Sequence, residues 1–251
     1  MSYQVLATST TPALIIYLLD VSASMQEDFG GQSRVDAVNS ALQKTVIKMV
    51  QRSTKGGPIS PRYRIAILAY SSSTMDLLGG VKTIGEVAAM GTPKLTTLDM
   101  TDTAGAFLEA ERLLKAELPN MQDCPAPLVC HMTDGDYNGA DPGPIAQRIK
   151  NMSVPDGNVL IENIYIKPGL VKVPDARQWS GISSDSQLPD AYAKALFQMS
   201  SPLPDSYRGV LGEYGYKLDA GTRMFIPGDQ VELVELGFVM ATATPITPPP
   251  Q

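Results

Sequence analysis

The sequence predicts a single α/β domain, doubly wound, with a mostly parallel six-stranded sheet, one antiparallel edge strand and helices on both faces. Apolar runs of strand length alternate with segments of helical period, which is typical of parallel strands joined by crossover helices. The run ALIIYLL at 13–19 is apolar throughout, as a central strand covered on both faces should be. We therefore expect one domain over 1–243, followed by a disordered, Pro-rich tail at 244–251.

The first half of the chain supplies three predicted strands and two helices. After the strand at 13–19, Ser33 and Asp36 resemble a capping box that opens a helix reaching about Gln51. A strand at 63–70 and a weaker one at 75–84 lie close together in the chain, which favours an antiparallel hairpin at the sheet edge. A second helix is expected at 103–118, where Pro119 ends it.

The second half continues the alternation of strands and helices. Strands are expected at 128–133, 159–166 and 222–226, and helices at 188–200 and 206–214. Asp141 followed by Pro142 predicts the start of a helix to about Met152. Asp229 is expected to cap a final helix that ends near Met240.

The net charge and the cysteine content indicate which functions and which cellular compartment to expect. The net charge of −6 argues against nucleic-acid binding, because nucleic-acid-binding proteins need clustered Lys and Arg. The two cysteines, Cys124 and Cys130, are too few for a disulfide framework, so we expect free thiols in a reducing compartment. The apolar run at 13–19 is too short to span a membrane, and no secretory signal precedes it. We expect a cytoplasmic protein without a membrane partner.

Short oxygen-bearing side chains gather in three segments of the chain. Asp20, Ser22 and Ser24 follow the first strand in the pattern Asp-x-Ser-x-Ser. Thr101-Asp102-Thr103 begins the second helix, and Thr133-Asp134-Gly135 ends the strand at 128–133. Ligands of open parallel sheets bind outside the carboxyl ends of the strands, so these segments can meet in one crevice.

The chemistry of this set predicts a divalent cation site. Two carboxylates and several hydroxyl groups, without His or Cys, form an all-oxygen ligand set that suits Mg²⁺, with Mn²⁺ or Ca²⁺ as alternatives, rather than Zn²⁺. Neutral hydroxyl ligands leave much of the cation's charge unbalanced. A carboxylate of a binding partner can supply the missing negative charge.

These segments resemble the metal-ion-dependent adhesion site of von Willebrand A domains. The similarity extends from about Thr11 to Met240. It is strongest to compact bacterial intracellular members, such as the TerY-like proteins of tellurium-resistance clusters. The shared patterns are R-x-D-A-V-N-x-A-L at 34–42 and P-L-V-x-x-M-T-D-G at 127–135. The resemblance implies kinases, phosphatases, AAA+ ATPases or other stress-cluster proteins as partners.

The same resemblance implies a role for each candidate ligand. The first loop would supply Asp20, Ser22 and Ser24, the second loop Thr101, and the third loop Asp134 acting largely through water. Many family members have Gly before the second-loop Thr, whereas Met100 stands there in this chain. That departure leaves Thr103 as the alternative to Thr101.

Other polar residues receive less specific interpretations. We expect His131, the sole histidine, to be a core residue with satisfied ring nitrogens. Glu27 and Asp28 are either a solvated loop, which we favour, or a second cation site beside the first. We assign no metal-binding role to Asp136 and Asp141.

The segment 167–187 is a long irregular loop that leaves the end of a predicted strand on the side of the metal loops. Loops of about twenty residues without secondary structure are often functional. This one contains Trp179 and Arg177, residue types enriched at interface hot spots. We expect the loop to border the metal site and these two residues to bind the partner. A loop packed on the domain with Trp179 buried is the alternative.

These features together predict a non-enzymatic, metal-dependent protein-binding module. A metal-dependent hydrolase or phosphatase is the first alternative, although such enzymes usually carry a second acid two residues after the first, where this chain has Ser22. No phosphate-binding loop is present, because Lys and Ser/Thr do not follow Gly56-Gly57. A scaffold protein with an empty site is the second alternative.

Overall fold

The computed structural model describes residues 3–54, 56–98, 100–135, 137 and 139–246. Its main sheet has the strand order β3-β2-β1-β5-β8-β9, with β4 also paired to β2. The parallel strands are β1 (Ala13–Asp20), β2 (Tyr63–Tyr70), β5 (Leu128–Thr133), β8 (Leu160–Tyr165) and β9 (Phe225–Pro227). All eight residues of β1 are buried, as expected for the central strand.

The antiparallel edge consists of two short strands, where the sequence predicted one. β3 (Thr74–Asp76) and β4 (Lys82–Thr83) pair with different parts of β2. The chain then turns into α2 (Ile84–Met90), so the predicted strand at 75–84 is wrong in its second part. Thr83 and Glu86 form a capping box that starts this helix.

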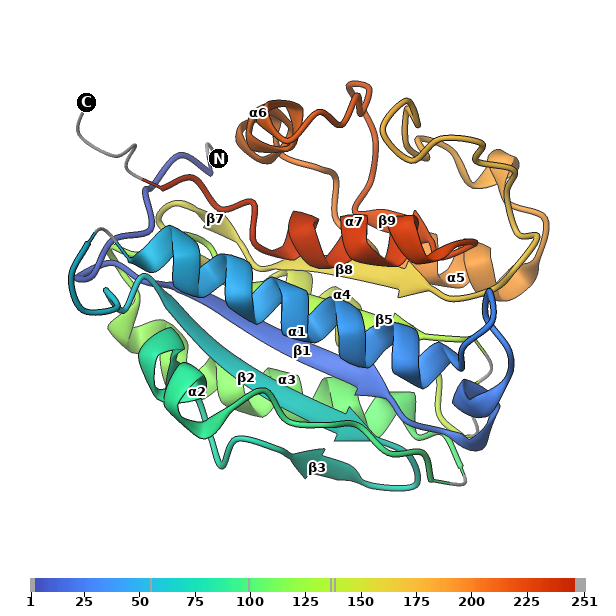
Figure 1. The fold of residues 1–251 in the computed structure, drawn as a ribbon, viewed down its shortest axis with the longest axis horizontal. Coiled ribbons are helices and arrows are strands. Elements are labelled where there is room, and N and C mark those ends of the chain that lie inside the picture. Colours follow the sequence, from blue (N-terminus) through green and yellow to red (C-terminus); the bar gives the residue numbers. More distant parts are fainter. Residues whose placement is uncertain (1–2, 55, 99, 136, 138, 247–251) are drawn as a thin grey trace.

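Helices cover both faces of the sheet (Figure 1). One face carries α1 (Arg34–Ser53) and α7 (Val231–Ala241), and the other carries α3 (Thr103–Glu117), α4 (Gly143–Lys150) and α5 (Ala191–Met199). α2 packs beside α1, and α6 (Asp205–Glu213) packs beside α7. This architecture confirms the predicted fold class.

Local signals explain where most helices begin. Ser33 accepts a hydrogen bond from the backbone N–H of Asp36 at the start of α1, as predicted. The Asp141 carboxylate accepts one from the N–H of Gly143 at the start of α4. The prediction for Asp229 was wrong, because α7 begins at Val231 and the Asp229 carboxylate instead accepts a hydrogen bond from the N–H of Gly169.

Two further segments differ from the sequence-based expectations. A short hairpin of β6 (Ser153–Val154) and β7 (Gly157–Asn158) precedes β8 and was not predicted. The start of the predicted tail packs on the domain: Thr244 is buried and bonds to the Tyr207 hydroxyl, and Ile246 forms a bridge with Ala7. The rest of the predicted tail, 247–251, lies outside the described residues.

Both cysteines, Cys124 and Cys130, are buried free thiols, as expected. No helix in the described parts of the chain is both long and apolar enough to cross a membrane.

Candidate metal site

The candidate site lies at the carboxyl edge of the sheet, where β1 and β5 end side by side. The two strands pair in parallel as far as Leu19 and Met132. The next residues, Asp20 and Thr133, therefore leave the sheet together, and Asp134 follows. This is the meeting of the first and third polar segments that the sequence predicted (Figure 1).

Asp20 is the buried centre of the site, with no exposed surface. One carboxylate oxygen accepts a hydrogen bond of 2.8 Å from the N–H of Ser22, and the other accepts one of 2.7 Å from the Thr133 hydroxyl. Burial raises the pKa of Asp20 to about 6, while these hydrogen bonds lower it. The carboxylate is thus held by donors that favour its ionised form.

The serine hydroxyls of the first loop converge beside Asp20. Ser22 is buried and Ser24 is half-buried. Their hydroxyl oxygens lie 3.1 Å apart, close enough to face a single ion. A 3-10 turn over Ala23–Gln26 follows Ser22 and gives the loop this curvature.

The backbone of the second loop bonds to the first loop and to the residue that follows β2. The N–H of Leu98 donates to the Val21 carbonyl, and the N–H of Asp102 donates to the Ser71 carbonyl, each at 2.6 Å. Thr101 and Thr103 are both buried. Burial raises the pKa of Tyr70, and hydrogen bonding with Thr103 and Thr133 opposes that rise.

Asp134 faces the site differently from Asp20. Its carboxylate accepts a 2.7 Å hydrogen bond from Nη1 of Arg34, the first residue of α1. The same guanidinium pairs with Glu27 at 2.8 Å. Sequence reasoning assigned no role to Arg34, and its pairing with a residue 100 positions away left no local signal.

His131 is a core residue with both ring nitrogens bonded, as predicted. Nε2 lies 2.7 Å from the Tyr70 hydroxyl, and Nδ1 lies 2.7 Å from Oδ1 of Asn163. The Asn163 amide donates to the Leu196 carbonyl and the Ser200 hydroxyl. Burial lowers the pKa of His131 to about 4, so the ring is neutral at physiological pH.

The acidic residues around the site have other partners. Glu27 pairs with Arg34, as described, and Asp28 joins Ser33 in a backbone bridge. Asp141 is exposed and accepts a hydrogen bond from the N–H of Gly143, the first residue of α4. Asp136 lies outside the described residues.

The loop at 167–187 packs on the domain beside β9 and α7. The N–H of Gly169 bonds to Asp229, the Val173 carbonyl to Gln230, and the Ile182 carbonyl to Arg223. These contacts lie on the far side of β8 from β1.

Trp179 is only 9% exposed in this loop. The prediction that Trp179 is exposed for a partner is therefore wrong. The alternative, in which the loop packs on the domain and buries Trp179, describes this structure. The sequence could not decide between the two, because burial depends on how the loop packs in the folded chain.

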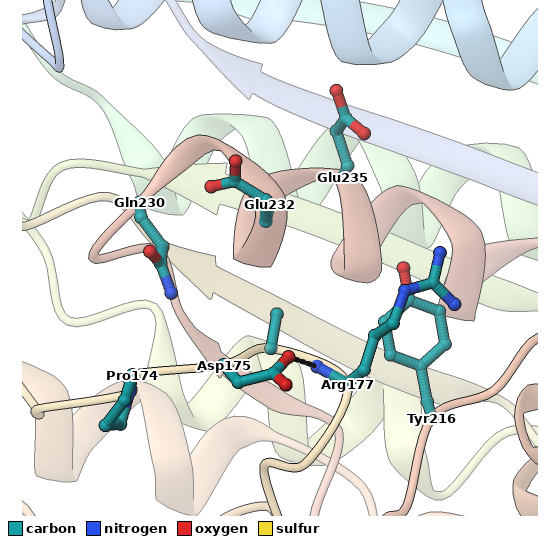
Figure 2. Close-up of a pocket in the computed structure, with 8 residues that line it drawn as sticks. Pro174, Asp175, Arg177, Tyr216, Gln230, Glu232 and Glu235 are labelled. Carbon is teal, nitrogen blue, oxygen red and sulfur yellow. Dashed lines mark hydrogen bonds between the residues drawn. The ribbon is translucent and has the colours of Figure 1, made fainter.

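Arg177 is exposed and lines a pocket of about 330 Å³. Its guanidinium lies 5.5 Å from the Tyr216 ring centre and donates to the Tyr214 carbonyl at 2.8 Å. Figure 2 shows this side chain beside Tyr216, with Glu232 and Glu235 of α7 on the other side of the pocket. The partner-binding role of Arg177 stays a prediction.

The donors present fit a hard divalent cation. Among the described residues, no group of three or more His, Cys, Asp or Glu side chains could hold a metal ion. The candidate set instead combines the Asp20 and Asp134 carboxylates with the hydroxyls of Ser22, Ser24 and Thr101. An all-oxygen set of this kind binds hard divalent cations.

Comparison with known proteins gives fold-level similarity. No protein-family model matches the chain, and no curated protein matches it. Proximal thread matrix protein 1 of the mussel byssus is similar in structure, with 17% identity over 92% of this chain and 48% of its own, and a TM-score of 0.52. A structure of that protein with a zinc-occupied MIDAS motif has 13% identity, coverage of 95% and 47%, and a TM-score of 0.54.

A pilus adhesin, SpaC from Lactobacillus rhamnosus GG, is also similar. It is 10% identical over 93% of this chain and 30% of its own, with a TM-score of 0.58. The chain therefore spans about half or less of the length of these structural neighbours. Together with the strand order, these similarities show that the chain has the α/β fold of von Willebrand A domains.

Proposed function

We propose that the chain is a non-enzymatic protein-binding module that grips an acidic residue of a partner protein through a bound Mg²⁺ ion. Mn²⁺ and Ca²⁺ are the alternative cations. The observation that carries the proposal is the convergence of Asp20, Ser22 and Ser24 at the end of β1, with Asp134 at the adjacent end of β5. The zinc-occupied MIDAS of a structural neighbour supports a divalent cation in such a fold.

Each residue has a distinct role in the proposed site. Asp20 supplies the buried negative charge, and Ser22 and Ser24 supply neutral oxygen atoms. Thr101 supplies the second-loop ligand, with Thr103 as the alternative. Asp134, which Arg34 already holds, acts largely through water.

The surface beside the site suits a partner whose acidic residue has apolar neighbours. Met100 and Leu98 are 58% and 43% exposed in the second loop, next to Thr101. Tyr137, which follows the third loop, forms an edge-on pair with Tyr192 of α5, with ring centres 6.0 Å apart. Exposed apolar and aromatic side chains of this kind are typical interface anchors.

An enzymatic role finds less support. A hydrolase needs a general base near its nucleophile, and both nitrogens of His131 are committed to hydrogen bonds within the core. A phosphatase assay with Mg²⁺ and a generic phosphate ester tests this alternative. Turnover that is lost in Asp20→Asn would overturn the binding-module proposal, and metal analysis that finds no bound ion would favour an empty scaffold.

Sequence motifs and composition support three further proposals: the TerY-like type, the cytoplasmic location and the class of partner. We infer that kinases, phosphatases and AAA+ ATPases are the first partners to test. The direct experiment is a pull-down in Mg²⁺ compared with one in EDTA, with Asp20→Asn as the matched variant. We expect partner capture in Mg²⁺ alone and only by the unmodified chain. Capture that survives full chelation would contradict the proposal.

A further inference from the structure

Arg34 joins three parts of the candidate metal site. Nη1 donates to the Asp134 carboxylate at 2.7 Å and to the Ser24 carbonyl at 3.2 Å. Nη2 pairs with Glu27 at 2.8 Å. The side chains of Arg34 and Asp134 are only 12% and 3% exposed, so solvent screens this pair far less than a surface ion pair.

The position of Arg34 changes the charge of the site. Asp20 and Asp134 carry two negative charges, and Arg34 offsets one of them. Glu27 also pairs with Arg34, but its side chain is 63% exposed, so water screens its charge. A divalent cation bound among the three less exposed groups, Asp20, Asp134 and Arg34, would leave the local charge positive. Without Arg34, the same two carboxylates would neutralise the cation and reduce its attraction for a further carboxylate.

We propose that Arg34 is a positioning residue that keeps Asp134 away from direct contact with the metal and keeps the loaded site positive, so that the site selects a carboxylate ligand. This inference rests on the proposed function, because it concerns the same metal site. It assigns Arg34 two opposing effects. The guanidinium weakens the binding of the metal and strengthens the binding of an acidic ligand to the metal-loaded protein.

The opposing effects separate this role from a merely structural one. A residue that only clamps the loops together would, on removal, weaken the binding of metal and of acidic ligand alike. A residue that sets charge and position would, on removal, strengthen the first and weaken the second. Binding of Mg²⁺, and of acetate to the Mg²⁺-loaded protein, can be measured without knowing the natural partner.

The experiment compares Arg34→Gln with the unmodified chain, using calorimetry for Mg²⁺ and nuclear magnetic resonance titration for acetate. We expect Mg²⁺ to bind roughly tenfold more tightly and acetate roughly tenfold more weakly in the variant. Arg208→Gln is the matched control: it removes the same charge from α6, where Arg208 pairs with Asp205, and should change neither affinity.

Asp134→Asn provides a second variant should Arg34→Gln fail to fold. It removes the negative charge that Arg34 offsets, so Mg²⁺ should bind more weakly and acetate more tightly than in the unmodified chain. Parallel changes of the two affinities in either variant, or no change in both, overturn the role of Arg34. If the unmodified chain binds no Mg²⁺, the proposed function itself fails.

Discussion

Two carboxyl groups, Asp20 and Glu162, are completely buried in the same sheet but have opposite surroundings. Asp20 ends β1 and accepts two hydrogen bonds, from Ser22 and Thr133. Glu162 lies within β8, and neither of its oxygens has a hydrogen-bond partner among the described residues. Hydrogen-bond donors favour the ionised form of Asp20, whereas Glu162 lies in apolar surroundings.

The neighbours of each group extend this contrast. Behind Asp20, Thr133 contacts Tyr70, and Tyr70 bonds to His131, which bonds to Asn163. We refer to these five residues as the Asp20 network.

Glu162 lies instead in a row across three strands, beside Cys130 and Tyr17, which we call the Glu162 row. The Tyr17 hydroxyl also lacks a partner among the described residues, and the Cys130 thiol is at most a weak donor to Glu162. The two sets occupy opposite faces of the sheet, against α3 and α7 respectively.

The comparison shows that burial alone does not mark a functional carboxylate. Burial raises the pKa of Glu162 well above its ordinary value, and only a weak hydrogen bond from the Cys130 thiol opposes that rise. Burial also raises the pKa of Asp20, but donors oppose it there. A buried acid with donors aimed at it is a candidate cation ligand, and a buried acid without them is a neutral core residue.

The largest effect is expected from breaking the Asp20 network at His131. His131→Ala removes a fully buried ring, and with it the hydrogen bonds to the Tyr70 hydroxyl and to Oδ1 of Asn163. We expect the free energy of unfolding to fall by about 4 kcal/mol, measured by urea denaturation. A loss below about 1 kcal/mol would show that this network contributes little to stability.

Glu162→Gln should have the opposite sign and depend on pH. The pKa of Glu162 is raised above 4.5 by burial, so the folded state holds its proton more tightly than the unfolded state. The contribution of Glu162 to the free energy of unfolding is therefore fully present below about pH 4.5. It declines as the pH rises towards the pKa of the folded state, by up to about 1.4 kcal/mol per pH unit.

Glutamine cannot ionise, so the variant should be more stable than the unmodified chain at pH 7 and nearly equal to it at pH 4. Denaturation curves across this range measure the difference. Stability–pH profiles that run parallel for the two proteins would mean that Glu162 is not held neutral.

The smallest expected effect is stabilisation by Mg²⁺. The unmodified chain and Glu162→Gln should both gain about 2.7 kcal/mol at a Mg²⁺ concentration one hundred times the dissociation constant. Asp20→Asn should gain nothing while remaining folded in EDTA. Equal stabilisation of Asp20→Asn would place the cation elsewhere.

The sequence predicted the sheet because its central strands are covered on both faces and are therefore almost wholly apolar. It also predicted the loops of Asp20 and Asp134, because residues that end adjacent parallel strands meet at one edge. α2 could have been found from the capping box of Thr83 and Glu86. The burial of Trp179 and the pairing of Arg34 with Asp134 could not, because both depend on contacts between distant parts of the chain.

The central claim is that a divalent cation binds beside Asp20, and calorimetric titration with Mg²⁺ tests it most directly. The titration compares the unmodified chain with Asp20→Asn and with Asp123→Asn, a control that removes the same charge from an exposed loop before β5. We predict one Mg²⁺ per chain for the unmodified protein and for Asp123→Asn, and no binding for Asp20→Asn. Equal Mg²⁺ affinity in all three proteins, or no binding to any of them, would contradict the claim.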